Sequence, residues 1–169
     1  MIKAWSYKEE YKLLSNKILK SLDKVFKSNQ LFFGEELKKF ERIFLKTNKS
    51  KYGIGVKSGT EALIVALKTL KIKINDEVIT VSNTAIPTIS AIKNVGAKVK
   101  FVDVGNDYLI DIEDLKKKIT SKTKAIMCIH VLGTSSNLSQ IKKLTNKKNI
   151  ILIEDTCESL GAKFNNKFL

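Results

Sequence analysis

The sequence contains very little histidine, proline, arginine or cysteine. Its 169 residues include one histidine, one proline and two cysteines, and Arg42 is the only arginine. One histidine, with Cys128 and Cys157 far apart in the sequence, gives no metal-ligand spacing, so we expect no bound metal. No apolar run is long enough to span a bilayer, and residues 1–6 lack the apolar core of a signal peptide. We therefore expect a cytoplasmic chain with reduced thiols and no membrane partner.

The formal net charge of +14 raises the alternative of a basic α/β domain that binds nucleic acid. The positive charge comes almost entirely from lysines spread along the whole chain. Nucleic-acid-binding proteins usually cluster their charge and favour arginine for bidentate contacts. A lysine-rich composition explains the charge more simply, so we expect no nucleic-acid partner. A failure to bind DNA or RNA at any salt concentration would exclude the alternative.

The hydrophobic pattern divides the chain into a helical arm and an α/β domain. Residues 1–48 form the arm, with apolar residues at helical spacing over 7–26 and 35–44. Residues 49–169 alternate between the two kinds of element. Strands are predicted at 53–56, 78–82, 99–104, 125–131 and 150–154, and helices at 60–70, 86–94, 112–119 and 138–147. This alternation predicts the α/β class, with a mostly parallel sheet and helices on both of its faces.

Two short segments carry candidate chemistry. Ser58, Gly59 and Thr60 form a turn before a predicted helix, where main-chain N–H groups and the helix dipole can hold a phosphate. The alternative is a simple helix N-cap. Asp155 follows a buried apolar run, which predicts that it lies at the carboxyl end of a central strand. An acid in such a place needs a partner. Together the two segments suit a phosphorylated pyridine cofactor, because a carboxylate keeps the ring nitrogen protonated and the ring then withdraws electrons from the substrate.

Two further residues leave alternatives open. His130 suggests acid–base catalysis, but a strand-end histidine satisfied by the backbone is the favoured interpretation, since the sequence pairs it with no nucleophile. Lys57 lies beside the phosphate turn, where it would either attract an anion or be one more surface lysine.

An ordered set of motifs runs from about Gly34 to the end of the chain. The motifs are residues 34–41, 52–63, 76–80, 130–133 and 154–162. In this order they resemble the DegT/DnrJ/EryC1/StrS family of pyridoxal-phosphate-dependent sugar aminotransferases. The resemblance implies the N-terminal part of the large domain of a fold type I pyridoxal-phosphate (PLP) enzyme. It also implies that Ser58, Gly59 and Thr60 hold the cofactor phosphate and that Asp155 pairs with the pyridine nitrogen.

Two positions differ from the usual family pattern. Ala85 lies where many members place an aromatic ring against the cofactor. Glu158 lies near the cofactor's phenolic oxygen, where most aminotransferase members have glutamine. An acid there would repel a phenolate unless one of the two carried a proton. The family's 3-dehydratases also carry an acid near this position, so Glu158 weakens the aminotransferase interpretation.

The resemblance implies a nucleotide-sugar aminotransferase that converts a keto sugar to an amino sugar, with glutamate as donor, for surface polysaccharide or glycoside synthesis. Its expected partners are a nucleotide-linked keto sugar, an amino donor and a second copy of the chain. The family's Schiff-base lysine, replaced by histidine in the dehydratases, is expected beyond Leu169, as is the small C-terminal domain. The alternatives are therefore a sugar 3-dehydratase of the same family and a truncated, catalytically inactive fragment.

Overall fold

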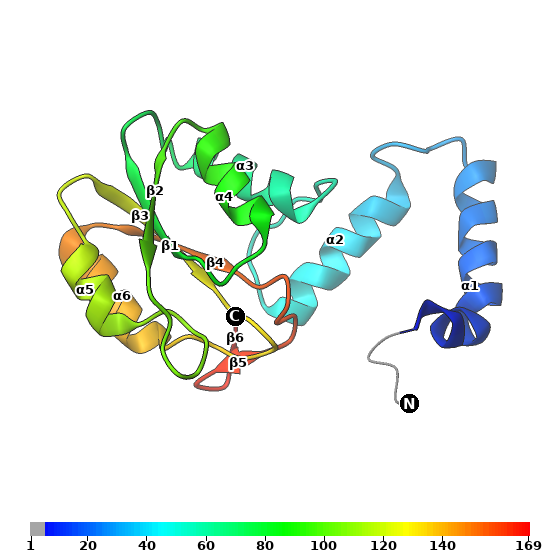
Figure 1. Cartoon of the computed structure of the whole chain (residues 1–169). Coiled ribbons are helices and arrows are strands. Elements are labelled where there is room, and N and C mark those ends of the chain that lie inside the picture. The colour runs from blue at the N-terminus through cyan, green and yellow to red at the C-terminus, as the bar shows by residue number, and fades with distance from the viewer. Residues whose placement is uncertain (1–5) are drawn as a thin grey trace. The chain divides into compact units, whose positions relative to one another are not determined.

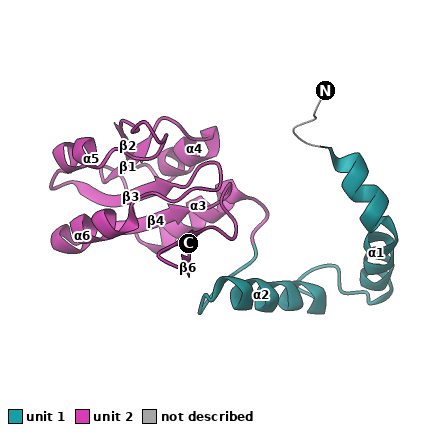
Figure 2. Ribbon diagram, turned by 90° about the horizontal axis from the view of Figure 1, so that it is seen from below, with its two compact units in different colours: residues 1–55 teal, residues 56–169 magenta. Residues whose placement is uncertain are grey.

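The structure, a computed structural model, describes residues 6–169 and consists of two compact units. The first unit ends at Gly55 and the second begins at Val56 (Figure 2). The sequence predicted a division between residues 48 and 49. The segment between the two positions lies with the helices, because the N–H of Gly55 donates a hydrogen bond to Oε1 of Glu41, at 2.7 Å.

The first unit contains helices α1 (Tyr7–Lys27) and α2 (Glu35–Asn48), neither of which includes a buried residue. The predicted strand at 53–56 is wrong, because this segment pairs with no strand in the described part of the chain. The N–H of Gly55 donates to the Glu41 side chain instead of a strand, and Gly53 lies against the side chain of Leu45. Among residues 6–169, no helix has the length and apolarity needed to cross a membrane.

The second unit is a four-stranded parallel sheet with two helices on each face (Figure 1). The strands, in spatial order, are β2 (Lys98–Val102), β1 (Glu77–Val81), β3 (Thr123–Ile129) and β4 (Ile151–Asp155). Helices α3 (Gly59–Thr69) and α4 (Ile86–Asn94) cover one face, and α5 (Ile112–Lys118) and α6 (Leu138–Lys148) cover the other. The predicted fold class is confirmed.

The core lies on both faces of the two inner strands. Ile79 of β1 and Ile126 of β3 have no solvent exposure. Leu67 of α3 and Leu115 of α5 are equally buried, on helices from opposite faces of the sheet. Helices on both faces explain why the inner strands read as continuous apolar runs.

The order of the strands decides where the candidate acid lies. All strands of a parallel sheet end at the same edge, so Asp155 at the end of β4 lies beside the loops that follow β1 and β3. The sequence predicted a central strand for Asp155. That prediction is wrong for this sheet, because β4 pairs only with β3 and forms its outer strand.

A short hairpin near the end of the chain was missed by the sequence prediction. Strands β5 (Lys163–Phe164) and β6 (Lys167–Phe168) pair in antiparallel orientation. Asn165 and Asn166 connect them with φ angles of 49° and 62°. Two successive positive φ angles define a type I′ turn, for which asparagine is favoured. The Asn-Asn pair was therefore the available signal.

Candidate functional site

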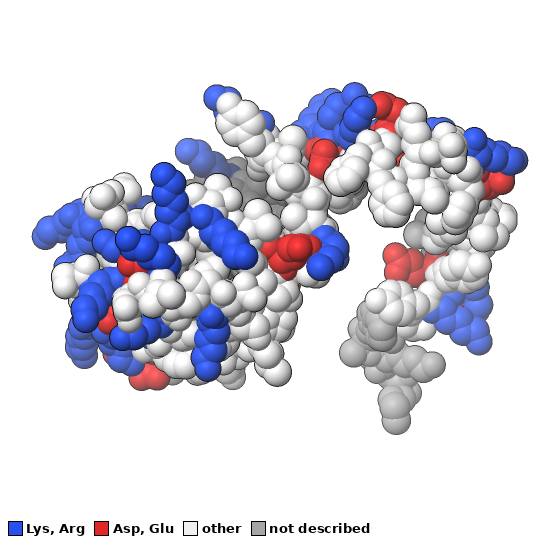
Figure 3. Space-filling view, turned by 90° about the horizontal axis from the view of Figure 1, so that it is seen from above, with Lys and Arg blue, Asp and Glu red and all other residues white. Residues whose placement is uncertain are grey.

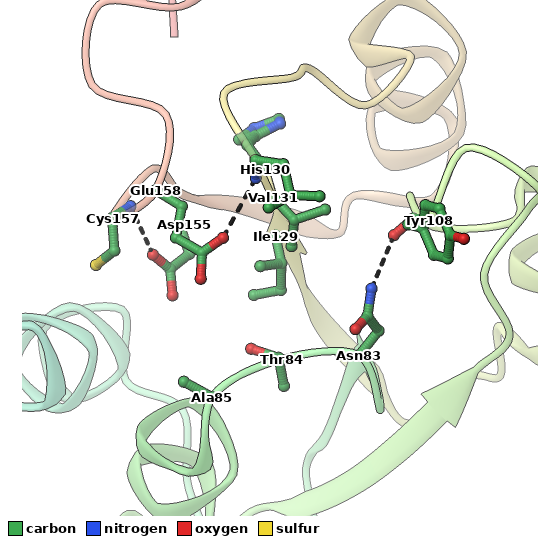
Figure 4. A pocket seen from close by; sticks show the side chains of 11 residues that line it. Asn83, Thr84, Ala85, Tyr108, Ile129, His130, Val131, Asp155, Cys157 and Glu158 are labelled. Atoms are coloured by element: carbon green, nitrogen blue, oxygen red, sulfur yellow. Dashed lines mark hydrogen bonds between the residues drawn. The ribbon is translucent and has the colours of Figure 1, made fainter. Parts of the chain in front are cut away.

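A cavity of about 480 Å³ lies at the carboxyl ends of the parallel strands (Figure 4). Open α/β sheets bind ligands at this edge. Its walls come from the segments that end or follow each strand: Asn83, Thr84 and Ala85 after β1, Tyr108 after β2, Ile129, His130, Val131 and Leu132 at β3, and Asp155, Cys157 and Glu158 at β4. Three residues predicted from the sequence, Ala85, Asp155 and Glu158, therefore line one cavity.

Asp155 is held by main-chain groups on both sides. Its carbonyl oxygen accepts a hydrogen bond from the N–H of His130, at 3.1 Å, which continues the pairing of β3 with β4. Its carboxylate oxygen Oδ1 accepts the N–H of Cys157, also at 3.1 Å. The carboxylate is thereby fixed at the strand end, inside the cavity wall.

Glu158 links the segment after β4 to the loop after β3. Its Oε2 accepts the N–H of Leu132 at 3.2 Å, and its carbonyl oxygen accepts the N–H of Gly133 at 3.1 Å. Leu132 and Gly133 both have positive φ angles, 52° and 74°, so this is a sharp turn that the two bonds stabilise. Figure 4 shows the side chains of Asp155 and Glu158 on the same side of the cavity.

Ser58, Gly59 and Thr60 form the start of α3, as the sequence predicted. Ser58 is the N-cap, and its Oγ accepts the N–H of Glu61 at 3.2 Å. None of the three residues lines the cavity described above. A Cβ placed on Gly59 would nevertheless lie 3.2 Å from Sγ of Cys157, so the N-terminus of α3 adjoins the segment that carries Asp155 and Glu158.

These residues fit a phosphorylated pyridine cofactor. The first turn of α3 offers main-chain N–H groups at the positive end of the helix dipole, and glycine at its first position leaves the approach free of a side chain. Asp155 would supply the carboxylate for a ring nitrogen. Nζ of Lys57 lies 3.7 Å from Oε1 of Glu61, and the Lys57 side chain is 81% exposed. Lys57 is therefore a surface lysine that pairs with a residue in the first turn of α3.

Ala85 contributes only a methyl group to the cavity wall, at the position where many members of the similar family have an aromatic ring. It is the N-cap of α4, and Pro87 lies in the first turn that follows. On the same wall, Asn83 donates from Nδ2 to the carbonyl oxygen of Tyr108, at 3.3 Å. Sequence reasoning missed Asn83 and Tyr108. The available signal was that Asn83 closely follows a buried strand, at the edge where ligands bind.

His130 contributes its backbone to the cavity while its imidazole points away from it (Figure 4). The ring is fully buried, and Nδ1 accepts the N–H of Ser136 at 3.1 Å. A nitrogen that accepts carries no proton, so the neutral ring has its proton on Nε2, which lies 3.4 Å from Oε2 of Glu154. This geometry supports the interpretation of a buried structural histidine.

Glu154 gives a testable dependence of stability on pH. Nε2 of His130 lies 3.4 Å from one carboxylate oxygen of Glu154, and Nζ of Lys142 lies 3.2 Å from the other. These two neighbours, His130 first, hold the pKa of this carboxyl below its usual 4.5. Its ionised form therefore stabilises the fold at pH values above 4.5, and this contribution is lost as the pH falls through the lowered pKa. We expect Glu154→Gln to reduce the free energy of unfolding by about 1–2 kcal/mol near neutrality and by progressively less in acid.

Urea unfolding from about pH 7 to about pH 3 measures this difference. Glu113→Gln is the matched control, because Glu113 is 72% exposed and pairs with Lys116 on its own helix. Exposed pairs of this kind contribute about 0–1 kcal/mol. If the stability difference between Glu154→Gln and the unaltered chain stayed constant across this pH range, the charge of Glu154 would not stabilise the fold.

Comparison with known proteins identifies the family. The model of the DegT/DnrJ/EryC1/StrS aminotransferase family matches residues 12–169. The chain belongs to this family. The resemblance recognised from the sequence motifs is thus confirmed, and so is pyridoxal phosphate as the cofactor of the family and its structural neighbours.

Relatives and solved structures of two enzyme kinds are similar to the chain. A dTDP-3-amino-3,4,6-trideoxy-alpha-D-glucose transaminase of Micromonospora megalomicea subsp. nigra is 36% identical over 160 residues, covering 94% of this chain and 43% of the relative. DesV of S. venezuelae, solved with a ketimine intermediate, has a TM-score of 0.94 at 28% identity, covering 97% and 44%. A GDP-4-keto-6-deoxymannose-3-dehydratase, solved with a trapped PLP–glutamate geminal diamine, has a TM-score of 0.84 at 38% identity, covering 89% and 41%.

The chain therefore spans about two fifths of the length of the proteins it matches. Its family, its parallel fold and the family cofactor are established by these matches. The roles of Ser58, Gly59, Thr60, Asp155 and Glu158 toward that cofactor remain predictions.

Proposed function

We propose that this chain is the cofactor-binding part of a PLP-dependent nucleotide-sugar aminotransferase, which converts a keto sugar to an amino sugar with glutamate as donor. One observation carries the proposal. The end of β4 and the segment after it place Asp155 and Glu158 on one cavity, and this segment also adjoins the N-terminus of α3 through Cys157 and Gly59. This arrangement supports one site made of a phosphate-binding turn and a carboxylate for a pyridine nitrogen. The nucleotide-sugar transaminases among the relatives support the substrate class.

Each side chain then has a definite task. The cofactor, when bound, supplies the ring that withdraws electrons from the substrate carbon. The first N–H groups of α3 bind and orient its phosphate. Asp155 holds a proton at the ring nitrogen, because an adjacent carboxylate favours the charged form of that nitrogen. Ala85 leaves space beside the cavity, where a larger side chain would restrict the substrate.

A sugar 3-dehydratase is the second candidate, and Glu158 is the observation that favours it. Its Oε2 accepts the main-chain N–H of Leu132 at 3.2 Å, which holds an acid on the cavity wall where most aminotransferase members have glutamine. An ionised Glu158 near a phenolate is unfavourable unless a proton is shared between them. A 3-dehydratase is among the relatives as well. Nitrogen-15-labelled glutamate separates the two reactions, because only an aminotransferase leaves the label on the sugar.

We infer further that the enzyme acts in the cytoplasm as a homodimer, in surface polysaccharide or glycoside synthesis, with no nucleic-acid or membrane partner. Three observations support parts of this. Cys128 and Cys157 are both free thiols. Helix α1 exposes an apolar stripe that includes Leu14, Ile18 and Leu22, and such stripes favour association.

Basic side chains are spread over both units (Figure 3), which argues against a nucleic-acid site. For this chain by itself, the alternative to an active enzyme is a truncated fragment without catalytic activity.

Binding of pyridoxal phosphate tests the proposal directly. We expect the chain to bind the cofactor in competition with inorganic phosphate, and Asp155→Asn to weaken binding by about 10- to 100-fold, since one charge-assisted hydrogen bond is lost. Fluorescence titration measures both dissociation constants.

Asp103→Asn is the matched control, because Asp103 also follows a strand end but does not line the cavity. An absence of binding to the unaltered chain would refute the proposal. Equal affinities of the Asp155→Asn and Asp103→Asn chains would refute the role of Asp155.

A further inference from the structure

The loop that follows β3 contains a turn with an unfavourable backbone conformation. A hydrogen bond of 2.9 Å from the N–H of Thr134 to the carbonyl oxygen of Val131 closes this turn around Leu132 and Gly133. Both central residues have positive φ angles, 52° and 74°, as in a type I′ turn. Glycine adopts such angles freely, whereas leucine rarely does. Leu132 is 78% exposed, so its own packing does not explain the conformation, and neighbouring segments have to hold the turn.

Glu158 holds this turn from the side of the cavity. Its Oε2 accepts the N–H of Leu132 at 3.2 Å, and its carbonyl oxygen accepts the N–H of Gly133 at 3.1 Å. The bond to Oε2 acts in both directions, because it fixes the carboxylate as much as it fixes the turn. The place of the Glu158 carboxylate on the cavity wall therefore depends on the conformation of the loop.

The His130 side chain holds the same loop from its buried side. The ring has no solvent exposure, its Nδ1 accepts the N–H of Ser136 at 3.1 Å, and its Nε2 lies 3.4 Å from Oε2 of Glu154. The bond to Ser136 closes the loop over residues 130–136, and the turn at Leu132 lies inside it. Ser136 is fully buried too, so loss of the Nδ1 acceptor would leave a buried N–H without this bond.

We propose that His130 is a positioning residue whose imidazole, through Ser136 and the turn at Leu132, fixes the Glu158 carboxylate on the cavity wall. The inference rests on the proposed function, because it matters for the reaction only if Glu158 faces the cofactor. Each link is a hydrogen bond, from Nδ1 of His130 to the loop and from the loop to Oε2 of Glu158. An acid held in one place needs less reorganisation when a ligand binds.

The first experiment needs no cofactor and compares two variants of His130. Oδ1 of an asparagine lies close to the place of Nδ1 and can accept the N–H of Ser136, whereas the amide of a glutamine reaches toward the place of Nε2. We expect His130→Gln to speed amide hydrogen exchange at Leu132 and Ser136 by at least about tenfold, and His130→Asn by no more than about threefold. The amide of Ile126, in the core, reports on opening of the whole unit and is the internal control.

The unaltered chain decides the matter if His130→Gln does not fold. In low concentrations of urea, the amides of Leu132 and Ser136 should then exchange through one shared opening, with the same dependence on urea. Separate openings for the two amides would overturn the proposal, because the loop would not act as one unit.

The second experiment measures what the loop does for the site, with 4′-deoxypyridoxine 5′-phosphate as the probe. This compound keeps the phosphate and the phenolic oxygen of the cofactor but has no aldehyde that could react with lysines. We expect Glu158→Gln to tighten its binding by about five- to tenfold, because a fixed carboxylate no longer repels the phenolate.

The same replacement is then made in both His130 variants. In His130→Gln the gain from Glu158→Gln is expected to fall to within about twofold, because the released carboxylate can turn away from the phenolate. In His130→Asn the gain should return to at least about fivefold. Fluorescence titration gives the dissociation constants. Each gain is a ratio within one background, so a general loss of affinity caused by a looser fold cancels.

The outcomes separate the two proposals. If the unaltered chain does not bind 4′-deoxypyridoxine 5′-phosphate, the proposed function fails and the role of His130 toward the site fails with it. If it binds but Glu158→Gln gives no gain, or gives the same gain in His130→Gln, the function stands and the positioning role of His130 is refuted.

Discussion

A Gly59→Val chain is expected to lose pyridoxal phosphate affinity on the order of a hundredfold while its free energy of unfolding changes by less than about 1 kcal/mol. Gly59 is the first residue of α3, and its missing side chain leaves the N-terminal N–H groups open. Even a single Cβ would lie 3.2 Å from Sγ of Cys157. The branched side chain of valine would also occupy the place from which a phosphate must approach. Fluorescence titration and urea unfolding measure the two quantities.

Graded variants identify the cause of this effect. Gly59→Ala should reduce affinity less than Gly59→Val, and adding Cys157→Gly to Gly59→Ala should relieve the crowding between the two side chains. Thr69→Val, an exposed substitution at the other end of α3, controls for valine in this helix and should leave affinity unchanged. Full affinity in the Gly59→Val chain would show that the start of α3 does not hold the phosphate.

The sequence predicted the strands and helices of the second unit because burial there is periodic. Every inner strand has helices on both faces, so its residues form an apolar run such as that of β3, and the helices between strands bury one face each. The predicted strand at 53–56 was wrong because an apolar run that contains glycine can be extended without pairing with a neighbouring strand. Whether it joins a sheet depends on contacts that the local sequence does not contain.

The candidate site was predicted as far as strand ends determine it. Asp155 was found because an acid after a buried strand is unusual, whereas Glu158 was found only through the resemblance to the family. Asn83 and Tyr108 were missed because they are 25 positions apart, and only the parallel sheet brings their loops together. The position of β4 at the edge of the sheet was missed for a similar reason, because the local sequence pattern does not determine the order of strands in a sheet. The orientation of the His130 ring also depends on a distant partner, Glu154.

Ile126→Ala is expected to lower the free energy of unfolding by about 2–5 kcal/mol, a large fraction of the stability of a typical domain. Ile126 has no solvent exposure and lies in β3 between Ile79 of β1 and Leu152 of β4. Its replacement leaves a cavity that the surrounding sheet and helices can fill only in part. Urea unfolding of the cofactor-free chain measures the change.

The matched control is Ile86→Ala, the same substitution at a position that is 80% exposed, where we expect a change below about 1 kcal/mol. Ile126 does not line the cavity, so the folded Ile126→Ala chain should bind pyridoxal phosphate as the unaltered chain does. This is the opposite of the Gly59→Val result, in which affinity falls and stability is kept. A loss of affinity in folded Ile126→Ala would mean that the geometry of the cavity depends on the packing of β3, and that the site and the core are not separable.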